Sequence, residues 1–475
     1  MAFLIGGANS AADTGYDVAN SCKFDGTSAY LAKTPGSNGT SKTFTISVWI
    51  KRCKLGATQT VFSNGDMSDG NPRVVLGFNS SDQLDFLNYE SGVSGRLVSQ
   101  RKFRDPSAWY HVLVNMDTTE STAGDRMRMY INGTEETVFD TDTNPSLNAD
   151  SEFAKDARPM EIGIAYGNDE YFDGYMAEYC VIDGSQLAAS SFGEFDEDSP
   201  TIWKPKDVSG LTFGTHGFYL DFEDSANLGN DANGGTDLDE NNIAAADQSS
   251  DSPTNNFCTL NPADNNNNTN LPTISEGNLE VISVSDNTWS ITPGTIALPK
   301  SGKWYYEVEA VSGRAGDRSA MAGWANPAAD NPLSNGSMFS RNSNGNIMRD
   351  DTSIATGYTT WQADGDILGC YIDMDNSKLY WAMNGTIQAS GTGISFDGGF
   401  DDEDFILPMV QVINLDKLSV NFGNPATNFA IASGNADANG YGNFEFDPSD
   451  GGNSSFDSAA KDFYAICTKN LAEFG

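Results

Sequence analysis

The sequence has few of the side chains that carry out catalysis. Histidine occurs only at His111 and His216, and no Gly-x-Ser-x-Gly segment marks a nucleophilic serine. A Ser-His-Asp site is therefore not indicated. His111 follows Trp109 and Tyr110 in an alternating stretch, which predicts a scaffold position in a strand. We expect no enzyme activity, no catalytic residues and no cofactor.

The cysteines lack the spacing of a metal site or of a dense disulfide framework, because no Cys-x-x-Cys pair occurs. The six are Cys22, Cys53, Cys180, Cys258, Cys370 and Cys467. An even count permits disulfides, but Cys370 lies inside an expected strand. We therefore expect buried free thiols.

Long apolar runs are also missing. No stretch of about 18 apolar residues occurs, so no transmembrane helix and no membrane insertion are predicted. The start, "MAFLIGGANSAADTGYD", has no positively charged region before its few apolar residues. It does not predict a signal peptide, and we expect synthesis in the cytoplasm.

Basic residues are scarce. The chain has 27 Lys and Arg against 66 Asp and Glu, which gives a net charge of −39 at pH 7. Such a field repels phosphate backbones and anionic lipid headgroups, so nucleic acid and membrane surfaces are not expected as partners.

Turn residues and short alternating segments dominate what is present. The 475 residues suit two or three domains, and 48 glycines with abundant Asn, Asp and Ser indicate many turns. "KTFTISVWIKR" (42–52) alternates apolar and polar positions, and similar segments follow at 107–117, 126–139 and 171–187. This spacing, without helical periodicity, predicts an all-β chain built of β-sandwiches.

A regular hairpin is expected over residues 364–386, "DGDILGCYIDMDNSKLYWAMNGT". Both faces of its first arm carry apolar groups, so the hairpin should be covered on both sides. Asn384-Gly385 should close the second arm with a tight turn.

Five ordered pieces in residues 21–190 carry a resemblance. They are "FDGTSAYL", "TISVWIKR", "WYHVLVNMD", "MRMYINGT" and "FDGYMAEYCVIDGSQL". Their order resembles the laminin G-like, concanavalin A-like jelly roll. The resemblance implies that Trp109 and His111 begin a strand and that Asn132-Gly133 turns a hairpin.

The hairpin belongs to a second resemblance. "KWYYEVE", the hairpin, "LPMV" and "VNFG" occur within residues 276–423 in an order similar to SPRY domains, which are another type of β-sandwich. Residues 424–475 form a C-terminal extension, in which "AKDFYAICTKNLAEFG" should dock as strand or helix.

Residues 191–275 are rich in Asn, Asp, Ser and Gly and predict a long connector, with a short strand at 218–222. This connector and the arm at 1–20 resemble segments of bacteriophage fibre-like virion proteins. The resemblance implies a virion location, other virion proteins as partners, and a homo-oligomer.

Carboxylate groupings are relevant because the concanavalin A-like jelly rolls that residues 21–190 resemble also include glycosidases. "GEFDEDSP" contains Glu194, Asp196 and Asp198, but Ser199 stands where a glutamate is wanted. "FEFDPSDG" contains Glu445, Asp447 and Asp450 and lies outside both sandwiches. Neither fits an acid pair on one strand face. With 66 acidic residues, chance spacing explains both.

Metal and sugar sites are not predicted either. Asp231 and Asn233 have the spacing of an EF-hand loop, but Thr236 and Asn242 stand where glycine and a bidentate glutamate are needed. The acidic loops 64–72 and 397–405 are expected to be solvated. The aromatic runs Trp304-Tyr305-Tyr306 and Tyr380-Trp381 are expected to pack in cores.

The features together predict a binding and structural protein with an unknown site. We expect a tail-fibre or virion-appendage component that presents rigid sandwiches to a glycan or protein of the host surface. Two alternatives stay open: a polysaccharide-cleaving enzyme on the jelly roll, and a purely architectural decoration protein.

Overall fold

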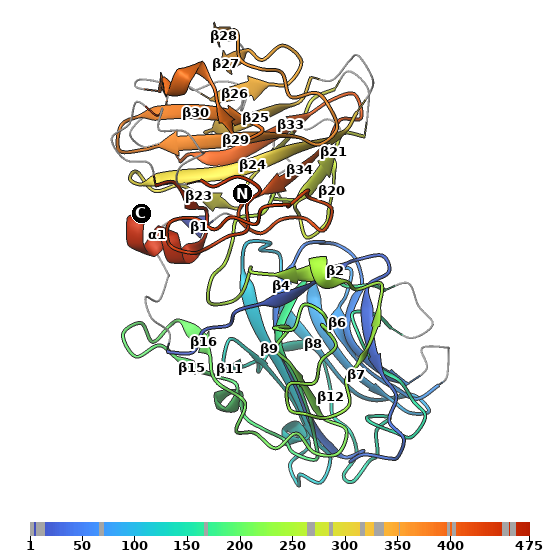
Figure 1. Cartoon of the computed structure of the whole chain (residues 1–475). Coiled ribbons are helices and arrows are strands. Elements are labelled where there is room, and N and C mark those ends of the chain that lie inside the picture. Colours follow the sequence, from blue (N-terminus) through green and yellow to red (C-terminus); the bar gives the residue numbers. More distant parts are fainter. Residues whose placement is uncertain are drawn as a thin grey trace. The chain divides into compact units, whose positions relative to one another are not determined.

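The structure is a computed structural model. It describes residues 4–5, 15–65, 71–165, 170–263, 271–284, 288–313, 319–326, 337–350, 352–396, 400, 405–448, 456 and 462–475. The chain forms two compact units, Asp13–Thr254 and Asn255–Gly475 with Met1–Ala12. Strands dominate both units (Figure 1), which confirms the all-β prediction. No helix of the described residues is long and apolar enough to span a bilayer.

The Asp13–Thr254 unit contains two eight-stranded sheets. The first comprises β2 (Ser21–Asp25), β4 (Thr43–Arg52), β9 (Trp109–Asp117), β10 (Met127–Ile131), β11 (Thr134–Glu135), β14 (Asp173–Asp183), β17 (Phe218–Leu220) and β19 (Gln248–Ser249). Its order is β11-β10-β9-β4-β14-β2-β19, with β17 also paired to β14. We call it the β4 sheet.

The second sheet, the β6 sheet, faces the same core. It comprises β3 (Tyr30–Lys33), β5 (Gln59–Gly65), β6 (Arg73–Phe78), β7 (Gln83–Tyr89), β8 (Val93–Lys102), β12 (Phe139–Thr143), β13 (Met160–Ile162) and β18 (Asp239–Asn241). Its order is β12-β8-β7-β6-β5-β13-β3-β18. A separate hairpin pairs β15 (Gly193–Phe195) with β16 (Trp203–Pro205).

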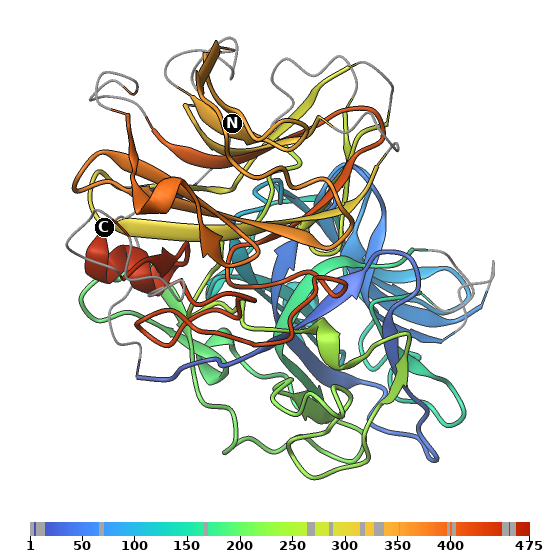
Figure 2. The same cartoon turned by 45° about the horizontal axis from the view of Figure 1, so that its top comes forward.

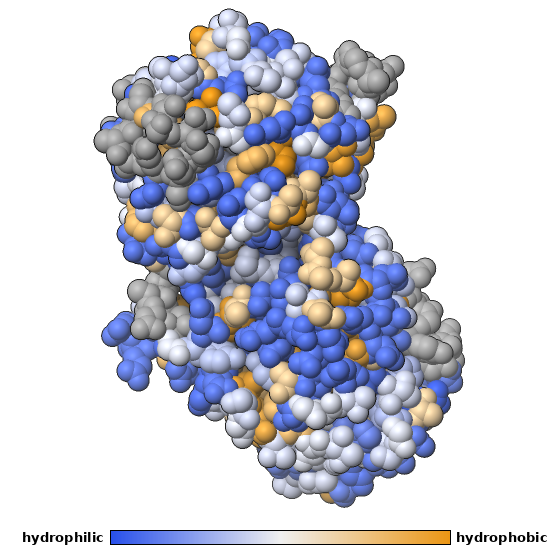
Figure 3. Space-filling model, viewed as in Figure 1, coloured by the Kyte–Doolittle hydropathy of each residue, from blue (hydrophilic) through white to orange (hydrophobic). Residues whose placement is uncertain are grey.

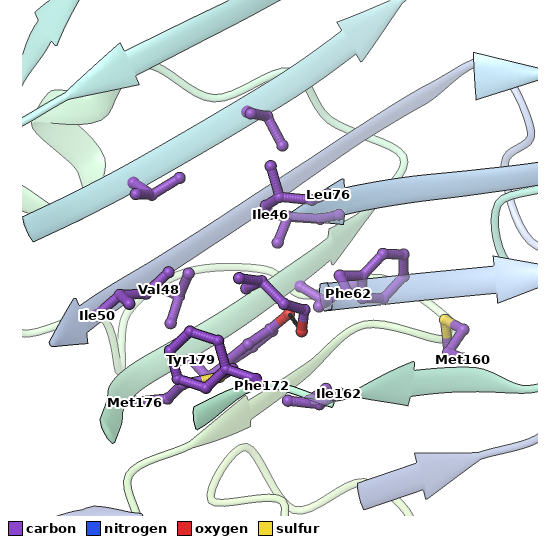
Figure 4. Close-up of a cluster of buried hydrophobic side chains, with 14 of the residues drawn as sticks. Ile46, Val48, Ile50, Phe62, Leu76, Met160, Ile162, Phe172, Met176 and Tyr179 are labelled. Carbon is purple, nitrogen blue, oxygen red and sulfur yellow. Dashed lines mark hydrogen bonds between the residues drawn. The ribbon is translucent and has the colours of Figure 1, made fainter. Parts of the chain in front are cut away.

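Period-two burial produces this sandwich. Ile46, Val48 and Ile50 of β4 point inward and meet Phe62 and Leu76 from the opposite sheet (Figure 4). Trp49 between them lies in a cluster on the outer face. The predicted alternation of residues 42–52 is therefore confirmed.

The start of β9 and the next hairpin also match the predictions. β9 begins at Trp109, and Asn132-Gly133 joins β10 to β11 with φ angles of 47° and 75°. Two successive positive φ values belong to the tight turns that suit the twist of a hairpin.

Residues 191–254 are not a connector, which corrects the prediction for most of the 191–275 segment. β17, close to the short strand expected at 218–222, pairs with β14; β18 pairs with β3, and β19 with β2. The polar composition hides the apolar side chains that hold the segment, because Phe218, Leu220, Phe222, Leu228, Leu238 and Ile243 are spread along it and enter the main core. The segment also docks on the outer face of the β4 sheet, where its polar groups receive partners.

Two contacts illustrate this docking on the outer face of the β4 sheet. Lys51 Nζ lies 2.6 Å from Asp251 Oδ2, with both side chains fully buried. Trp203 Nε1 donates to His111 Nδ1 at 3.1 Å. Phe192, Phe213 and their neighbours add a small apolar cluster.

The Asn255–Gly475 unit is built around a nine-stranded sheet, the β24 sheet. It comprises β20 (Thr273–Ser275), β21 (Glu280–Ile282), β24 (Lys303–Ser312), β29 (Asp366–Asp373), β30 (Lys378–Met383), β31 (Thr386–Ile387), β32 (Ile394–Ser395), β34 (Lys417–Asn421) and β35 (Tyr464–Ala465). The main path is β20-β21-β34-β24-β29-β30-β31, with β32 on β30 and β35 on β24.

A six-stranded sheet packs against it across a shared core. It comprises β22 (Ser290–Pro293), β25 (Met321–Ala325), β26 (Met338–Arg341), β27 (Ile347–Arg349), β28 (Thr352–Ala355) and β33 (Leu407–Val412). The order is β22-β33-β25-β26-β27-β28. In the predicted N-terminal arm, β1 (Leu4–Ile5) pairs in parallel with β23 (Ile296–Ala297).

The hairpin expected at 364–386 is formed by β29 and β30, paired from Leu368–Met383 to Asp373–Lys378. Cys370 faces the main core, whereas Tyr371 faces a second cluster on the opposite side. Asn384-Gly385 makes the closing turn with φ angles of 47° and 74°. Both faces of the hairpin are covered, as predicted.

The C-terminal extension supplies that second cover. It forms both elements left open by the sequence, since β35 pairs in parallel with β24 and α1 (Thr468–Phe474) follows. Figures 1 and 2 show this red segment beside β24. Phe444, Phe456 and Phe463 pack against Tyr305 and Tyr371.

Glu307 of β24 fixes the extension by hydrogen bonds. Its Oε1 accepts from Tyr305 Oη (2.9 Å) and the amide of Phe446 (2.8 Å), and its Oε2 from Asn421 Nδ2 and the amide of Glu445 (both 3.0 Å). Burial nevertheless raises the pKa of Glu307 to about 7. The carboxylate is thus a buried anchor with no basic partner among these contacts.

The face of the protein in Figure 3 is mainly hydrophilic, and hydrophobic residues are scattered over it in small groups. This distribution agrees with burial of the apolar strand positions inside the sandwiches.

Candidate functional site

A pocket opens on the outer face of the β6 sheet. Alternation along β6 sends Val74 and Leu76 into the core and leaves Arg73, Val75 and Gly77 to line the pocket. The lining residues are Thr58, Gln59, Thr60, Arg73, Val75, Gly77, Phe78, Asn79, Asp85, Leu87, Arg96 and Glu170. We call this set the β6 pocket.

The β6 pocket is small, with a volume of ≈ 220 Å³. Sites for drug-sized ligands measure roughly 300–1,000 Å³. The β6 pocket therefore suits one small ring or one unit of a longer chain. Val75 and Leu87 give it apolar surface, and the polar side chains around them supply donors and acceptors.

Arg96 and Asp85 form a two-point ion pair in the wall. Arg96 Nε donates to Asp85 Oδ1 at 3.0 Å, and Nη2 donates to Oδ2 at 2.5 Å. These hydrogen bonds raise the pKa of Arg96. The pair sits on neighbouring strands β8 and β7, so the sheet register fixes its geometry.

Arg73 is held differently. Its guanidinium lies over the ring of Tyr89, 4.2 Å from the centroid, and Nη1 donates to the carbonyl of Asn71 at 2.9 Å. Its Nε is buried without a hydrogen-bond partner. The ring fixes the planar group in place, and donor capacity remains.

Glu170 completes the wall beside Thr60, whose amide donates to the Glu170 carbonyl at 3.0 Å. Burial raises the pKa of the Glu170 carboxyl. Two arginines and two carboxyl-bearing residues thus line the pocket together with the apolar side chains of Val75 and Leu87. Such a site can bind a polyhydroxylated ring by hydrogen bonds and apolar contact.

The glycosidase alternative needs a free acid and a free base or nucleophile on one groove. Asp85 and Glu170 share the β6 pocket, but both Asp85 oxygens accept from Arg96. That engagement removes Asp85 as a ready nucleophile or base. The pocket arrangement therefore favours binding.

His111 lies in the scaffold, as predicted. It is fully buried, and Trp203 Nε1 donates to its Nδ1 at 3.1 Å. Nδ1 must then be the acceptor, so Nε2 carries the proton and donates to Ser47 Oγ at 2.9 Å. Burial lowers the pKa of His111 to about 3, which keeps the ring neutral.

His216 lies 3.2 Å from Ser37, measured from Nε2 to Oγ, a contact that the sequence did not suggest. A triad would also need a carboxylate on Nδ1. Asp183 Oδ2 instead accepts from the backbone amide of His216 at 3.2 Å. The three groups therefore do not form a Ser-His-Asp relay.

The carboxylate groupings from the sequence serve local structure. Asp196 accepts from the amides of Asp198 and Ser199 and contacts Lys204, which also lies 3.8 Å from Glu194.

The other grouping is also engaged locally. Glu445 Oε2 accepts from the amides of Ala432 and Ser433, and its own amide binds Glu307. Asp450 lies outside the described residues.

Asp231 accepts from the amides of Tyr219 and Asn233, and it lies 3.7 Å from Lys33. In the part of the chain that the structure describes, no group of three or more His, Cys, Asp or Glu side chains could hold a metal ion. Most of the acidic loops 64–72 and 397–405 falls outside that part.

The thiol and aromatic predictions are confirmed. All six cysteines are free and buried. Trp304, Tyr305, Tyr306, Tyr380 and Trp381 are all buried, in the main core or the second cluster of the Asn255–Gly475 unit.

Two family matches agree with these sandwiches. Residues 25–189 match the family described as the concanavalin A-like lectin/glucanases superfamily, and residues 303–425 match the SPRY domain. The chain contains a laminin G-like domain and a SPRY domain. The β6 pocket lies within the laminin G-like match, and the segment covering the β24 sheet extends beyond the SPRY match.

Solved structures with similar folds include three of note. The SPRY domain of human HERC1 has 16% identity and a TM-score of 0.27, covering 31% of this chain and 91% of its own. Domains LG4-5 of the mouse laminin alpha1 chain have 9% identity and a TM-score of 0.29, and the match covers 97% of this chain and 91% of the laminin structure.

A candidate carbohydrate-binding protein from Bacteroides ovatus has 17% identity and a TM-score of 0.33, and the match covers 48% of this chain and 60% of that protein. Because all three TM-scores are below 0.5, the domain assignments rest on the two family matches and not on these structures.

The residues of the β6 pocket were not identified from the sequence. Their signal was present, because Arg73, Asp85 and Arg96 interrupt strands at outward positions. Only the register shows that these outward charges meet around one pocket.

Proposed function

We propose that this chain is a non-enzymatic component of a phage virion appendage, and that its laminin G-like domain binds a glycan of the host surface through the β6 pocket. The Arg96–Asp85 pair carries the proposal. It fixes a planar, two-point polar group beside Val75 and Leu87, an arrangement suited to the hydroxyl and apolar faces of a sugar.

The charge around the pocket favours a neutral ligand. The lining includes two basic residues, Arg73 and Arg96, and two acidic residues, Asp85 and Glu170, so the pocket charges largely offset one another. The net charge of −39 repels acidic glycans at a distance. A pocket of this size gives weak single contacts, which a homo-oligomer on a particle multiplies.

Binding is tested with the full chain on an array of neutral and acidic oligosaccharides, followed by calorimetry on those that bind. Val75→Tyr should abolish binding because the larger side chain fills the pocket. The matched control is Val138→Tyr, since Val138 is an exposed valine that does not line the pocket. Equal binding by both variants contradicts the pocket assignment.

Turnover distinguishes the glycosidase alternative. Oligosaccharides that bind should be recovered intact after prolonged incubation with the protein. Release of shorter products that is lost in Glu170→Gln would replace binding by cleavage as the function.

The virion role is tested on purified particles. Peptides of this chain should be found by mass spectrometry, and labelled protein should bind to host cells. Particles without the chain contradict the location, and particle association without cell binding favours the architectural alternative.

A further inference from the structure

A buried lysine and aspartate meet on the outer face of the β4 sheet. Lys51 Nζ is 2.6 Å from Asp251 Oδ2, and both side chains have no exposed surface. Lys51 belongs to β4, whereas Asp251 belongs to the added segment docked on that sheet. The residues are 200 positions apart, within one unit of the chain.

We propose that Lys51 and Asp251 condense to an isopeptide bond that locks the added segment onto the laminin G-like domain. The inference concerns a covalent modification and does not depend on the glycan-binding proposal.

Trp109 places a donor where the reaction needs one. Its Nε1 donates to Asp251 Oδ1 at 2.9 Å, and it lies directly across from Lys51 in the β4–β9 register. Oδ1 is the oxygen that gains negative charge when an amine attacks the carboxyl carbon. The indole N–H would stabilise that charge beside two side chains that have no exposed surface.

The chemistry balances without a co-reactant. The ammonium passes one proton to Asp251 Oδ2, and the amine then forms the Nζ–Cγ bond. The nitrogen passes a second proton to Oδ2, the Cγ–Oδ2 bond breaks, and water leaves. The Oδ1 carbonyl reforms, and one hydrogen remains on the amide nitrogen.

The short distance between the two side chains and their burial both favour formation of the amide. The attacked carbon is bonded to the oxygen already in contact with Nζ, so the encounter is effectively unimolecular. Burying two charges is costly, and condensation replaces them with one neutral group.

Other pairs in the described residues provide internal controls. Lys417 Nζ is equally close to Glu280 Oε2, at 2.6 Å, but the Lys417 side chain is 27% exposed. Lys303 is buried beside Asp373, but their contact is 3.5 Å long. We expect these pairs to remain ionic.

The test measures the mass of the purified full chain under denaturing conditions. The expected mass is that of the polypeptide less one water molecule. Proteolytic mapping should give a branched peptide joining Lys51 to Asp251 and linear peptides for the two control pairs. An unreduced mass, with linear peptides at Lys51 and Asp251, overturns the proposal.

Lys51→Arg is the matched variant because it keeps a cation beside Asp251 but cannot form this amide. Its mass should lack the water loss, and Lys303→Arg should retain it. Water loss that persists in Lys51→Arg places dehydration elsewhere and also overturns the proposal. If Lys51→Arg does not fold, the wild-type peptide map alone decides.

Discussion

The two sandwiches each carry an added segment that covers an outer sheet face, but the contacts on the two covered faces differ. Residues 191–254 add Phe218, Leu220 and four other apolar side chains to the main core, and they cover the β4 sheet with buried polar contacts such as Lys51–Asp251 and Trp203–His111. The C-terminal extension docks on the β24 sheet through phenylalanines packed on tyrosines, with Glu307 as a buried anchor. A low overall hydrophobic content therefore does not prevent a segment from folding, because a few apolar side chains at suitable positions reach the core.

The comparison also shows what makes a polar segment dock. The outer face of the β4 sheet presents groups that need partners, including Lys51 and His111. The covering segment supplies those partners, and each then escapes the cost of burial without a hydrogen bond. On the β24 sheet, phenylalanine rings of the extension pack on Tyr305 and Tyr371, and Glu307 accepts hydrogen bonds from the amides of Glu445 and Phe446.

The largest expected effect is on the polar side of the comparison. Asp251→Ala removes the acidic partner, prevents the proposed Lys51–Asp251 amide and leaves the Lys51 charge buried, which should cost at least about 3–5 kcal/mol of unfolding free energy. Denaturant unfolding measures it. The exposed-pair variant Asp125→Ala is the control, because the Arg128–Asp125 pair lies at the surface. A loss below that of the control contradicts the polar docking account.

On the aromatic side, Phe463→Ala should cost about 3 kcal/mol, because it opens a cavity between Tyr371 and Phe456. The extension should then become cleavable by protease while the laminin G-like domain stays resistant. Phe195→Ala is the control, since that ring is 43% exposed. Equal losses in both variants show that the cover contributes little.

The pH dependence separates the two modes of docking further. The pKa of Glu307 is raised from 4.5 to about 7, so the folded state binds the proton more tightly than the unfolded state. Stability from this group is present below pH 4.5 and is lost as pH rises towards 7.

The unfolding free energy of Glu307→Gln should therefore change less with pH than that of the wild type. The difference between the two changes should be roughly 2 kcal/mol between pH 5 and 8. Parallel pH curves for the two proteins contradict burial as the dominant influence. Glu161 and Glu178, whose pKa values are also raised to about 7 by burial, are unchanged in the variant and cancel in the difference.

The smallest effect is expected at His111. Trp203→Phe keeps most of the ring contact but removes the donor to Nδ1, which should cost about 1–2 kcal/mol. NMR of the imidazole should show a neutral ring from pH 5 to 8 in the wild type, with the proton on Nε2. A protonated ring at pH 5 contradicts the account of its burial.

Much of the scaffold could be predicted from local pattern. The alternation of residues 42–52 and 364–386 selects strands with defined faces, and Asn-Gly pairs give the turns at 132–133 and 384–385. These features depend on neighbours in sequence, so they could be read directly. The β6 pocket could not, because its charges come from three strands and one loop.

The sequence by itself determined the all-β class, the two sandwich cores, the buried thiols and the acidic surface, because period-two burial and composition act locally or as sums. Tertiary structure decided that residues 191–254 fold, that Arg96 meets Asp85 and that Lys51 meets Asp251. Those outcomes depend on strand order and register, which bring together residues as many as 200 positions apart. Composition contains no information about which residues pair, whereas strand order and register in a sheet determine each pair.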